Sequence, residues 1–335
     1  MRDELHMPDV FTLADAGSAD LSRHMISTRV ASGEIRRLRR GLYCLHSTWE
    51  AADARRRHLL TAQAAARLGP LVLSHLSAAA VWDLPLPAGG AWKVQATAAS
   101  GSRPTRYLDG LTVYVAGLPA RDVKVVGGVA VTSPARTVAD CLRHLTAADA
   151  VAIADAALHR ELTRPDEVST VIRDQSSWPY AGRCVRAVPL IDGRRQSWLE
   201  SVSAVVLHRI GVPLGESQVV IMDESGRFVA RVDRYWEEDG VVGEADGQVK
   251  YAVQDLVGVE AARQALVREK SREDRLRDLG LEVIRWGAAD LAAGAGPVAA
   301  AFRRARTRHR GSRFTGQVRR LPPLRIELPE RRRAR

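Results

Sequence analysis

The fold of the C-terminal third is set mainly by residues 197–246, whose sequence is SWLESVSAVVLHRIGVPLGESQVVIMDESGRFVARVDRYWEEDGVVGEAD. It predicts one helix and then three strands, at residues 197–210, 217–223, 227–236 and 241–246. Farther along, a helix ends at Gly280, LEVIRW predicts a fourth strand, and a last helix runs to about Arg306. The predicted order is therefore α-β-β-β-α-β-α.

Carboxylate side chains gather where two of these strands end. Asp233 lies near the end of the second strand, and Glu244 and Asp246 alternate onto one face of the third strand. Charged side chains at adjacent strand ends are costly to place near a core unless they are solvated or bind a cation. Carboxylate oxygens are ligands that Mg²⁺ prefers, and bound Mg²⁺ would polarise a phosphodiester and lower the pKa of an attacking water. The pattern predicts a divalent-cation site.

Residues 196–306 resemble the PD-(D/E)XK nuclease superfamily, and within it the actinobacterial proteins related to very-short-patch-repair endonucleases. The stretches that carry the resemblance are SWLES, ARVDRYW, VVGEADGQVKY, EKSREDRLRDLG and VIRW. The resemblance implies a restriction-endonuclease-like core of α-β-β-β-α-β order at residues 196–308, with metal-dependent endodeoxyribonuclease activity. It also implies that Asp233 and Glu244 bind Mg²⁺ or Mn²⁺ and that Glu200 is the acid of the first helix.

The sequence departs from that superfamily at its lysine. The (D/E)-X-K pattern would place a lysine at position 246, where this chain has Asp246. Lys250 lies about 13 Å farther along if the strand continues at ~3.3 Å per residue, so it would approach only after a turn. Lys270 on the following helix is the other candidate. The missing lysine favours a nuclease fold that does not cleave, whereas the retained Asp233 and Glu244 favour a nuclease.

Each acid also has a structural explanation that the sequence leaves open. Glu200 stands three residues after the serine of SWLES, as in a capping box that satisfies backbone donors at a helix start. Asp233 could be a solvated strand end. Glu244 and Asp246 could stabilise a turn before the glycine that follows them.

The first 48 residues form a separate basic unit. Helix-start and helix-stop residues surround LSRHMISTRVASG, and EIRRLRRGLYCLH follows as two short strands. Two short helices followed by a basic hairpin are the layout of a winged helix-turn-helix. Residues 21–60 carry nine Arg against three acids, a local charge of 9 − 3 = +6. We expect DNA contacts from six arginines, two on the second helix and four on the wing: Arg23, Arg29, Arg36, Arg37, Arg39 and Arg40.

Residues 49–177 are predicted to form a mixed α/β module, and residues 178–195 a linker. From about 10–160 the chain resembles the AbiEi-type antitoxins of abortive-infection toxin–antitoxin systems, on the stretches LSHLSAA and VTSPARTVAD. That resemblance implies a winged-helix domain, often used for autorepression, followed by an antitoxin domain of a type IV system. A cognate toxin protein is then a candidate partner. His75 and Cys141 are expected to have structural roles.

Net charge is concentrated at the C-terminal end. The 335 residues carry 50 Lys and Arg against 39 Asp and Glu, and residues 301–335 hold 13 Arg against two Glu, so the rest of the chain is neutral. We expect residues 309–335 to be a disordered, solvated tail or a non-specific grip on phosphates. No segment reaches the ~20 apolar residues that span a bilayer, and three separated cysteines form neither a disulfide framework nor a zinc site. These features exclude a membrane protein and a disulfide-rich secreted domain, and they predict a cytoplasmic protein.

Two functions follow, and both require DNA. The first is a DNA-binding protein whose C-terminal domain is a Mg²⁺-dependent endonuclease. The second is an antitoxin-type transcriptional regulator that retains a nuclease fold without cleavage. Both share one expected fold class, an α/β multidomain protein with a winged helix-turn-helix, a mixed α/β module and a restriction-endonuclease-like core.

Overall fold

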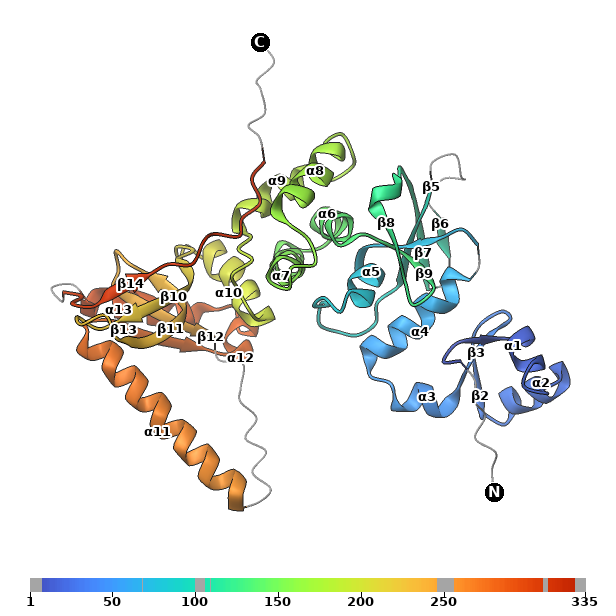
Figure 1. The fold of residues 1–335 in the computed structure, drawn as a ribbon, viewed down its shortest axis with the longest axis horizontal. Coiled ribbons are helices and arrows are strands. Elements are labelled where there is room, and N and C mark those ends of the chain that lie inside the picture. Colours follow the sequence, from blue (N-terminus) through green and yellow to red (C-terminus); the bar gives the residue numbers. More distant parts are fainter. Residues whose placement is uncertain are drawn as a thin grey trace, which may run out of the picture. The chain divides into compact units, whose positions relative to one another are not determined.

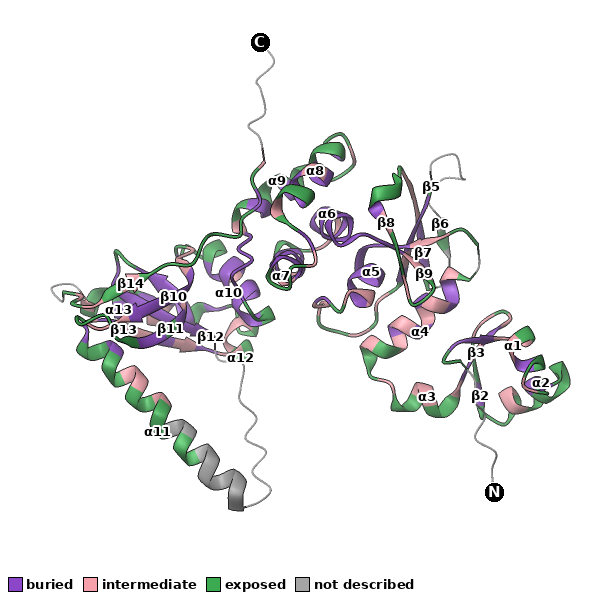
Figure 2. Cartoon of the chain, viewed as in Figure 1, coloured by how far each residue is buried: buried purple, intermediate pink, exposed green. Residues whose placement is uncertain are grey.

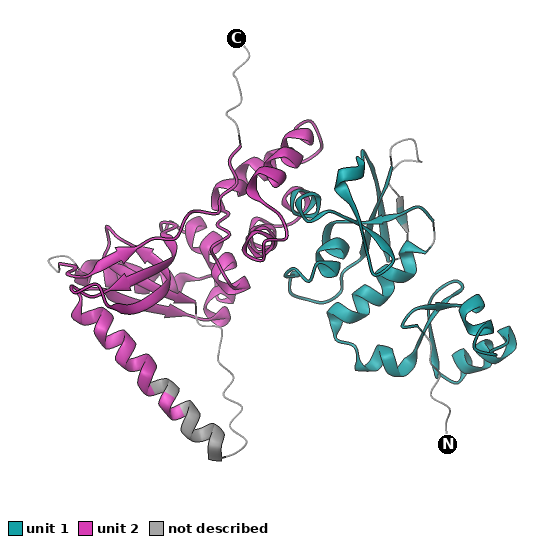
Figure 3. Cartoon of the chain, in the orientation of Figure 1, with its two compact units in different colours: residues 1–141 teal, residues 142–335 magenta. Residues whose placement is uncertain are grey.

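Three β-sheets organise the part of the chain that the structure describes. This computed structural model describes residues 8–67, 69–99, 106–108, 110–245, 256–309 and 313–328. The chain divides into two compact units, residues 1–141 and 142–335 (Figure 1, Figure 3). Two of the sheets lie in the first unit and one in the second, which confirms the expected mixed α/β, multidomain fold.

The N-terminal basic segment folds as a small winged-helix-like body. Its sheet has the order β1-β3-β2, built from β1 Phe11–Thr12, β2 Ile35–Arg39 and β3 Leu42–Leu45. Two helices precede the β2–β3 hairpin, α1 Leu13–Gly17 and α2 Arg23–Ala31. A small apolar core holds these helices on the sheet through Phe11, Ala16, Leu21, Ile26 and Ile35.

Local sequence explains where α2 begins and ends. Ser22 Oγ accepts a hydrogen bond from the Met25 amide at 3.2 Å, and serine is a preferred N-cap residue. After the helix, Gly33 adopts a φ of +79°, a left-handed conformation that costs a glycine little. Gly41, in the turn between β2 and β3, likewise has a φ of +77°. The hairpin therefore follows α2 closely, as the sequence predicts.

The second sheet of unit 1 has six strands in the order β6-β7-β5-β4-β9-β8. Their bounds are β4 Val72–Leu73, β5 Val94–Ala99, β6 Arg106–Leu108, β7 Leu111–Ala116, β8 Val123–Val126 and β9 Val129–Thr132. The helical elements of this region are α3 His46–Ala51, α4 Ala54–Ala66, α5 His75–Val81, the 3-10 turn η1 Ala120–Asp122 and α6 Pro134–His144. Ala62 of α4 and Ala78 of α5 pack on Leu73 and Val94 of the sheet, so both helices cover the same apolar cluster.

Unit 2 contains a five-stranded sheet in the order β13-β12-β11-β10-β14. The strands are β10 Glu216–Met222, β11 Phe228–Trp236, β12 Val241–Ala245, β13 Glu282–Trp286 and β14 Gln317–Arg319. The helical elements are α7 Ala147–His159, α8 Pro165–Asp174, α9 Ala181–Ala187, η2 Val188–Leu190, α10 Trp198–Arg209, α11 Leu256–Asp278, α12 Ala288–Ala292 and α13 Gly296–His309. From α10 to β13 the elements follow the α-β-β-β-α-β order predicted from the sequence.

The strands of this sheet are mostly buried (Figure 2). The β12–β13 pair is parallel, because α11 crosses over between them, and the other pairs are antiparallel. One apolar cluster joins Trp236 and Trp286 to Phe302 of α13, and a second joins Val219 and Val242 to Leu276 of α11. None of the described helices is long and apolar enough to cross a membrane.

The expected linker at 178–195 is an integral part of unit 2. It contains α9, and the segment after it is buried, with Asp192, Arg194 and Arg195 at most 8% exposed. Arg194 forms an ion pair with Asp192 at 2.7 Å, and Arg195 forms one with Asp155 of α7 at 2.8 Å. These buried ion pairs fix the segment against α7, so the linker prediction is wrong and the module expected at 49–177 is divided between the two units.

The expected disordered tail is also structured over residues 313–328. Strand β14 pairs antiparallel with β10, and Ile326 is only 4% exposed. Gly193 donates its amide to the Leu324 carbonyl at 2.9 Å, and Ser169 donates its hydroxyl to the Glu327 carbonyl at 2.7 Å. We call residues 313–328 the strap, because they run from the sheet to α8. The strap was not predicted from the sequence, because arginines interrupt the short apolar pattern of residues 313–328.

Candidate functional site

Asp233 of β11 and Glu244 of β12 lie on neighbouring antiparallel strands. Arg234 pairs with Gly243 in the ladder, so positions 233 and 244 are the next to face each other. The Ala245 amide donates a hydrogen bond to Asp233 Oδ2 at 2.9 Å, which ties the two strand ends together. The structure thus brings together the two carboxylates that the sequence predicts as metal ligands.

Glu200 joins this cluster from the first turn of α10. Ser197 Oγ accepts from the Glu200 amide at 3.1 Å, and Glu200 Oε2 accepts from the Gln196 amide at 3.1 Å, so Glu200 takes part in capping the helix. The same carboxylate oxygen also accepts a hydrogen bond from Gln218 Nε2 at 2.8 Å. Glu200 therefore has both the capping contacts and a place beside the acidic cluster.

Gln218 of β10 is a residue that sequence reasoning missed. Its Nε2 donates to Glu200 Oε2 at 2.8 Å and to Asp233 Oδ1 at 3.1 Å, so one amide links both acids. The residue is 2% exposed and has a φ of +56°, a left-handed conformation that costs a non-glycine residue about 1–2 kcal/mol. Strained backbone of this kind concentrates at functional sites. The available signal was an amide directly before the apolar run Val219–Met222 of the strand.

Arg234 holds the helix that carries Glu200 against the sheet. Its side chain is 1% exposed, and Nη2 donates to the Glu200 carbonyl at 3.0 Å while Nη1 donates to the Leu214 carbonyl at 3.1 Å. Burial, reinforced by the charge of Arg195, lowers the pKa of Arg234 to about 9. A buried guanidinium thus fixes the backbone behind the acidic cluster.

Burial dominates the electrostatics of the two strand carboxylates. Burial raises the pKa of Asp233, and the negative charge of Glu200 raises it further. Burial also raises the pKa of Glu244 to about 8, against the opposing charge of Arg272 and with a smaller contribution from Asp233. Neighbouring acids in a desolvated site ionise together only when a positive charge compensates them. Arg272 is a positive charge of this kind beside Glu244.

The cation that the structure places against Glu244 is Arg272 rather than a lysine. Arg272 Nη1 lies 3.2 Å from Glu244 Oε1. Lys270, two residues earlier on α11, is exposed. The other predicted site residues, Asp246 and Lys250, lie outside the described residues. Among the predicted candidates, the structure thus groups Asp233, Glu244 and Glu200, and it adds Arg272.

Arg272 belongs to a chain of alternating charges between α11 and β13. Glu269 accepts from Arg272 Nη2 at 2.7 Å and also pairs with Arg285 of β13. Arg285 Nε in turn lies 3.3 Å from Glu273, which pairs with Arg277. Trp286 beside Arg285 packs in the core. The network holds the Arg272 guanidinium at the edge of the acidic cluster.

The donors at this cluster fit a divalent cation in part. The described residues contain no group of three or more His, Cys, Asp and Glu side chains placed to hold a metal ion. Glu244 Oε1, however, is buried and makes no hydrogen bond, although Arg272 is near it. A buried carboxylate oxygen without a hydrogen bond, facing a second carboxylate, suits a hard cation such as Mg²⁺. Asp233 and Glu244 are the residues that would hold it.

The six arginines predicted to bind DNA are not equally exposed to solvent. Arg23, Arg37 and Arg40 are exposed. Arg36 is exposed as a residue, but its guanidinium stacks over the Trp49 ring at 4.3 Å. The remaining two, Arg29 and Arg39, are partly buried, and Arg29 lies 3.9 Å from Glu34.

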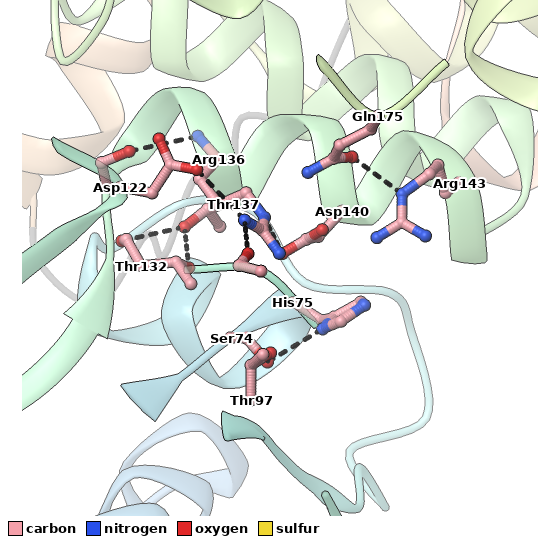
Figure 4. Close-up of polar contacts among 12 residues, drawn as sticks. Ser74, His75, Thr97, Asp122, Thr132, Arg136, Thr137, Asp140, Arg143 and Gln175 are labelled. Atoms are coloured by element: carbon pink, nitrogen blue, oxygen red, sulfur yellow. Dashed lines mark hydrogen bonds and ion pairs between the residues drawn. The ribbon is translucent and has the colours of Figure 1, made fainter. Parts of the chain in front are cut away.

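His75 is part of a buried polar cluster, as its structural role requires. It is 2% exposed, its ring stacks on Tyr114 with centroids 4.2 Å apart, and its Nδ1 lies 2.9 Å from Ser74 Oγ (Figure 4). Ser74 Oγ also accepts from Thr97 Oγ1 at 2.9 Å. Cys141 is fully buried in the same unit. His75 thus contributes to packing between α5 and the sheet, and Cys141 is a buried residue of α6.

The stretch VTSPARTVAD forms a buried ionic network rather than an exposed surface. Arg136 donates from Nε to Asp140 Oδ2 at 3.0 Å and from Nη1 to Asp122 Oδ2 at 3.1 Å (Figure 4). Arg136 is 2% exposed and Asp140 is fully buried. The network ties α6 to η1. An Arg and an Asp four residues apart on a helix was the signal that could have predicted it.

Residues 4–46 match the family model described as "Transcriptional regulator, AbiEi antitoxin". The N-terminal body is similar to AbiEi antitoxins. The match spans α1, α2 and the β2–β3 hairpin, so the resemblance to AbiEi antitoxins is confirmed for these winged-helix-like residues.

Two relatives match a longer stretch of the chain. They are the uncharacterized proteins MT2308 and Rv2248 of Mycobacterium tuberculosis, strains CDC 1551 / Oshkosh and H37Rv, each 27% identical over 159 residues. The matched stretch covers 48% of this chain and 55% of each relative, so the chain spans about half the length of the relatives it matches.

Proposed function

We propose that the chain is a DNA-binding transcriptional regulator of the antitoxin type. The observation that carries this proposal is the AbiEi antitoxin match at residues 4–46, which coincides with a winged-helix-like body. An autorepressor of this kind acts on DNA in the cytoplasm, and a cognate toxin protein would be its partner.

Exposed residues of the N-terminal body supply the chemistry for DNA binding. Helix α2 presents Arg23 and Thr28 to solvent, and the wing presents Arg37 and Arg40. A recognition helix reads base edges in the major groove, while arginines of a wing contact the flanking phosphates. Arg36 shapes the wing through its contact with the Trp49 ring.

A gel-shift titration of the operator DNA upstream of the chain's own gene tests this proposal. Replacing Arg37 and Arg40 together by Ala should weaken binding and reduce the salt slope by about 2, because two phosphate contacts are lost. Arg173→Ala is the matched control, since this exposed arginine of α8 donates to Thr170 of its own helix. Equal affinity and salt slope for the double variant and the wild type would contradict the proposal.

A second candidate function is metal-dependent cleavage of phosphodiester bonds by unit 2. The specific observation that favours it is the pairing of Asp233 and Glu244 on adjacent strands, with a Glu244 oxygen buried and without a hydrogen bond. A divalent cation held by these two residues would polarise the phosphodiester and lower the pKa of the attacking water. Gln218 would orient Asp233 and Glu200, and Arg234 would fix the helix behind them.

Incubation of plasmid and single-stranded DNA with the protein in Mg²⁺, in Mn²⁺ and in EDTA tests this activity. We expect cleavage with a divalent cation, none in EDTA, and a loss of at least about 100-fold in Asp233→Asn and Glu244→Gln. Asp223→Asn, in the β10–β11 turn, is a matched control away from the cluster. If the wild type cleaves no DNA under any of these conditions, the nuclease function is excluded and the regulator remains as the proposed function.

A further inference from the structure

The turn that leads from α8 into α9 exposes an aromatic ring. Tyr180, the last residue before α9, is 58% exposed. Its φ is +65°, a left-handed backbone conformation that is unfavourable for a residue with a Cβ atom, and strain of this kind is concentrated at functional sites. His144 meets the ring at 72° with the two centroids 5.9 Å apart, so the two rings do not stack on each other. Tyr180 is therefore a candidate ligand contact.

Arg143 holds the backbone of this turn in place. Its side chain is buried, Nε donates to Gln175 Oε1 at 2.9 Å, and Nη1 donates to the Pro179 carbonyl at 3.4 Å (Figure 4 draws the first of these bonds). The same guanidinium lies 5.0 Å from the centroid of the Trp178 ring, in a cation–π contact. These contacts fix the residues just before Tyr180. A ligand of the ring would therefore bind a turn that is already ordered, which lowers the entropic cost of binding.

Positive charge accompanies the exposed ring. The Arg183 guanidinium lies over the Tyr180 ring, 4.8 Å from its centroid. Arg186 follows three residues later on α9, a spacing that places the two side chains on the same side of the helix, and both arginines are exposed. Residues 175–187 contain these two arginines and no Asp or Glu, a local charge of +2. The surface thus combines an aromatic ring with two cations.

The surrounding protein does not neutralise these two charges. Among the described residues, no Asp or Glu forms an ion pair with Arg183 or Arg186. Arg183 donates from Nη1 to the Arg143 carbonyl at 3.5 Å, a long hydrogen bond that leaves its other N–H donors for a ligand. By contrast, Arg164 at the start of α8 pairs with Asp166 at 3.2 Å. The guanidinium groups beside Tyr180 are therefore available to an anion.

We propose that Tyr180, Arg183 and Arg186 form a site in unit 2 for single-stranded nucleic acid, with an unpaired base stacked on the ring and the neighbouring phosphates at the two arginines. We call these three residues the stacking site. Every base has a π-face, and aromatic rings beside positive charge hold single strands with little sequence preference. A duplex keeps its bases stacked on one another and offers no free face. The site goes beyond the proposed function, which concerns duplex DNA at the N-terminal body.

Fluorescence anisotropy of the full-length protein with a short labelled single strand tests the ring. Tyr180→Ala should lower the affinity about 5-fold to 100-fold, because a base stacked on an aromatic side chain contributes that much to binding. Tyr180→Phe should keep the wild-type affinity, since it retains the ring. If Tyr180→Ala lowers the melting temperature, Tyr180→Leu replaces it, because leucine is apolar but offers no π-face.

A strand without bases and the two arginines test the rest of the site. The wild type should bind an intact strand, as DNA or as RNA, more tightly than an abasic strand, and Tyr180→Ala should remove that preference. Arg183→Ala should weaken binding and reduce the salt slope by about 0.7, because one phosphate contact is lost. Arg304→Ala is the matched control, since it removes one exposed charge from α13 and should leave the preference for bases unchanged.

Equal affinities of Tyr180→Ala and the wild type for the intact strand would overturn the inference, and so would a wild type that binds intact and abasic strands equally. A wild type that binds poly-glutamate but no single strand would overturn it in favour of an acidic protein partner. Binding of the operator duplex should be the same in Tyr180→Ala and the wild type. A wild type that binds this duplex but no single strand therefore refutes the stacking site alone, and the reverse result refutes the proposed function alone.

Discussion

Arg195 and Asp155 form a fully buried ion pair, with Arg195 Nη1 2.8 Å from Asp155 Oδ2 and neither side chain more than 3% exposed. Asp155 belongs to α7, and Arg195 belongs to the segment before α10. The Asp192 amide donates to the other oxygen of Asp155 at 2.7 Å. This pair ties α7 to the segment that leads into α10, within unit 2.

Replacing Asp155 by Ala should destabilise the protein by about 3–5 kcal/mol, because Arg195 is left buried without a counter-charge. Urea denaturation followed by circular dichroism measures the loss. The double variant Asp155→Leu with Arg195→Met should recover much of it, since no buried charge remains. Asp166→Ala breaks an exposed pair with Arg164 and should change stability little. A wild-type midpoint for Asp155→Ala would refute the prediction.

Gln218→Leu should lower the free energy of unfolding by about 3 kcal/mol. The substitution keeps the volume but removes the amide that donates to Glu200 and Asp233, and hydrogen bonds to charged groups contribute about 1.5–3 kcal/mol each. Gln218→Gly loses the same bonds but relieves the left-handed backbone, so it should be less damaging than Leu. Thermal denaturation compares the three proteins. A Leu variant more stable than the Gly variant would contradict this.

Stability should fall as the pH rises from about 4.5 through 8. Glu244 has a folded-state pKa of about 8 against an ordinary 4.5, so in that window the folded state holds a proton that the unfolded state has released. Glu244→Gln removes this linkage. Its melting temperature should match the wild type near pH 4.5 and exceed it above pH 8. Glu224→Gln, an exposed carboxylate in the β10–β11 turn, should follow the wild type at every pH.

Deletion of residues 313–335 should destabilise unit 2 by at least about 2 kcal/mol, whereas deletion of 329–335 should not. The longer deletion removes β14 from the sheet and exposes the site of Ile326, whose burial alone contributes about 1.5–3 kcal/mol. Differential scanning calorimetry measures both truncations. Identical melting temperatures for the two would show that the strap contributes no stability.

The amino-acid sequence was sufficient to predict elements set by local patterns. Ser22 and Gly33 bound α2, Gly226 at φ +80° makes the β10–β11 turn, and Gly280 at φ +87° follows α11. These positions are governed by capping and by left-handed backbone, both of which depend on a few neighbouring residues. The facing of Asp233 and Glu244 followed from hairpin register in the same way.

The parts that the sequence did not predict depend on contacts between distant residues. Gln218 acquires its role from acids 18 and 15 positions away, and Arg272 meets Glu244 across a helix crossover. The strap reaches Ser169 from Glu327, a separation of 158 residues. In a chain with so many arginines, an individual arginine gives no signal of such a partner. Charge count alone therefore could not separate Arg272 from its exposed neighbours.

The position of β14 has a consequence for incomplete chains. Strand β14 covers the outer edge of β10, yet it is translated after every other strand of the sheet. Until then β10, with Val219, Val220 and Ile221 in sequence, has an open row of backbone donors and acceptors. Open apolar edges pair with other chains. A ribosome that stalls before residue 313, or a protease that clips the strap, would therefore release molecules prone to self-association and to removal by cellular quality control.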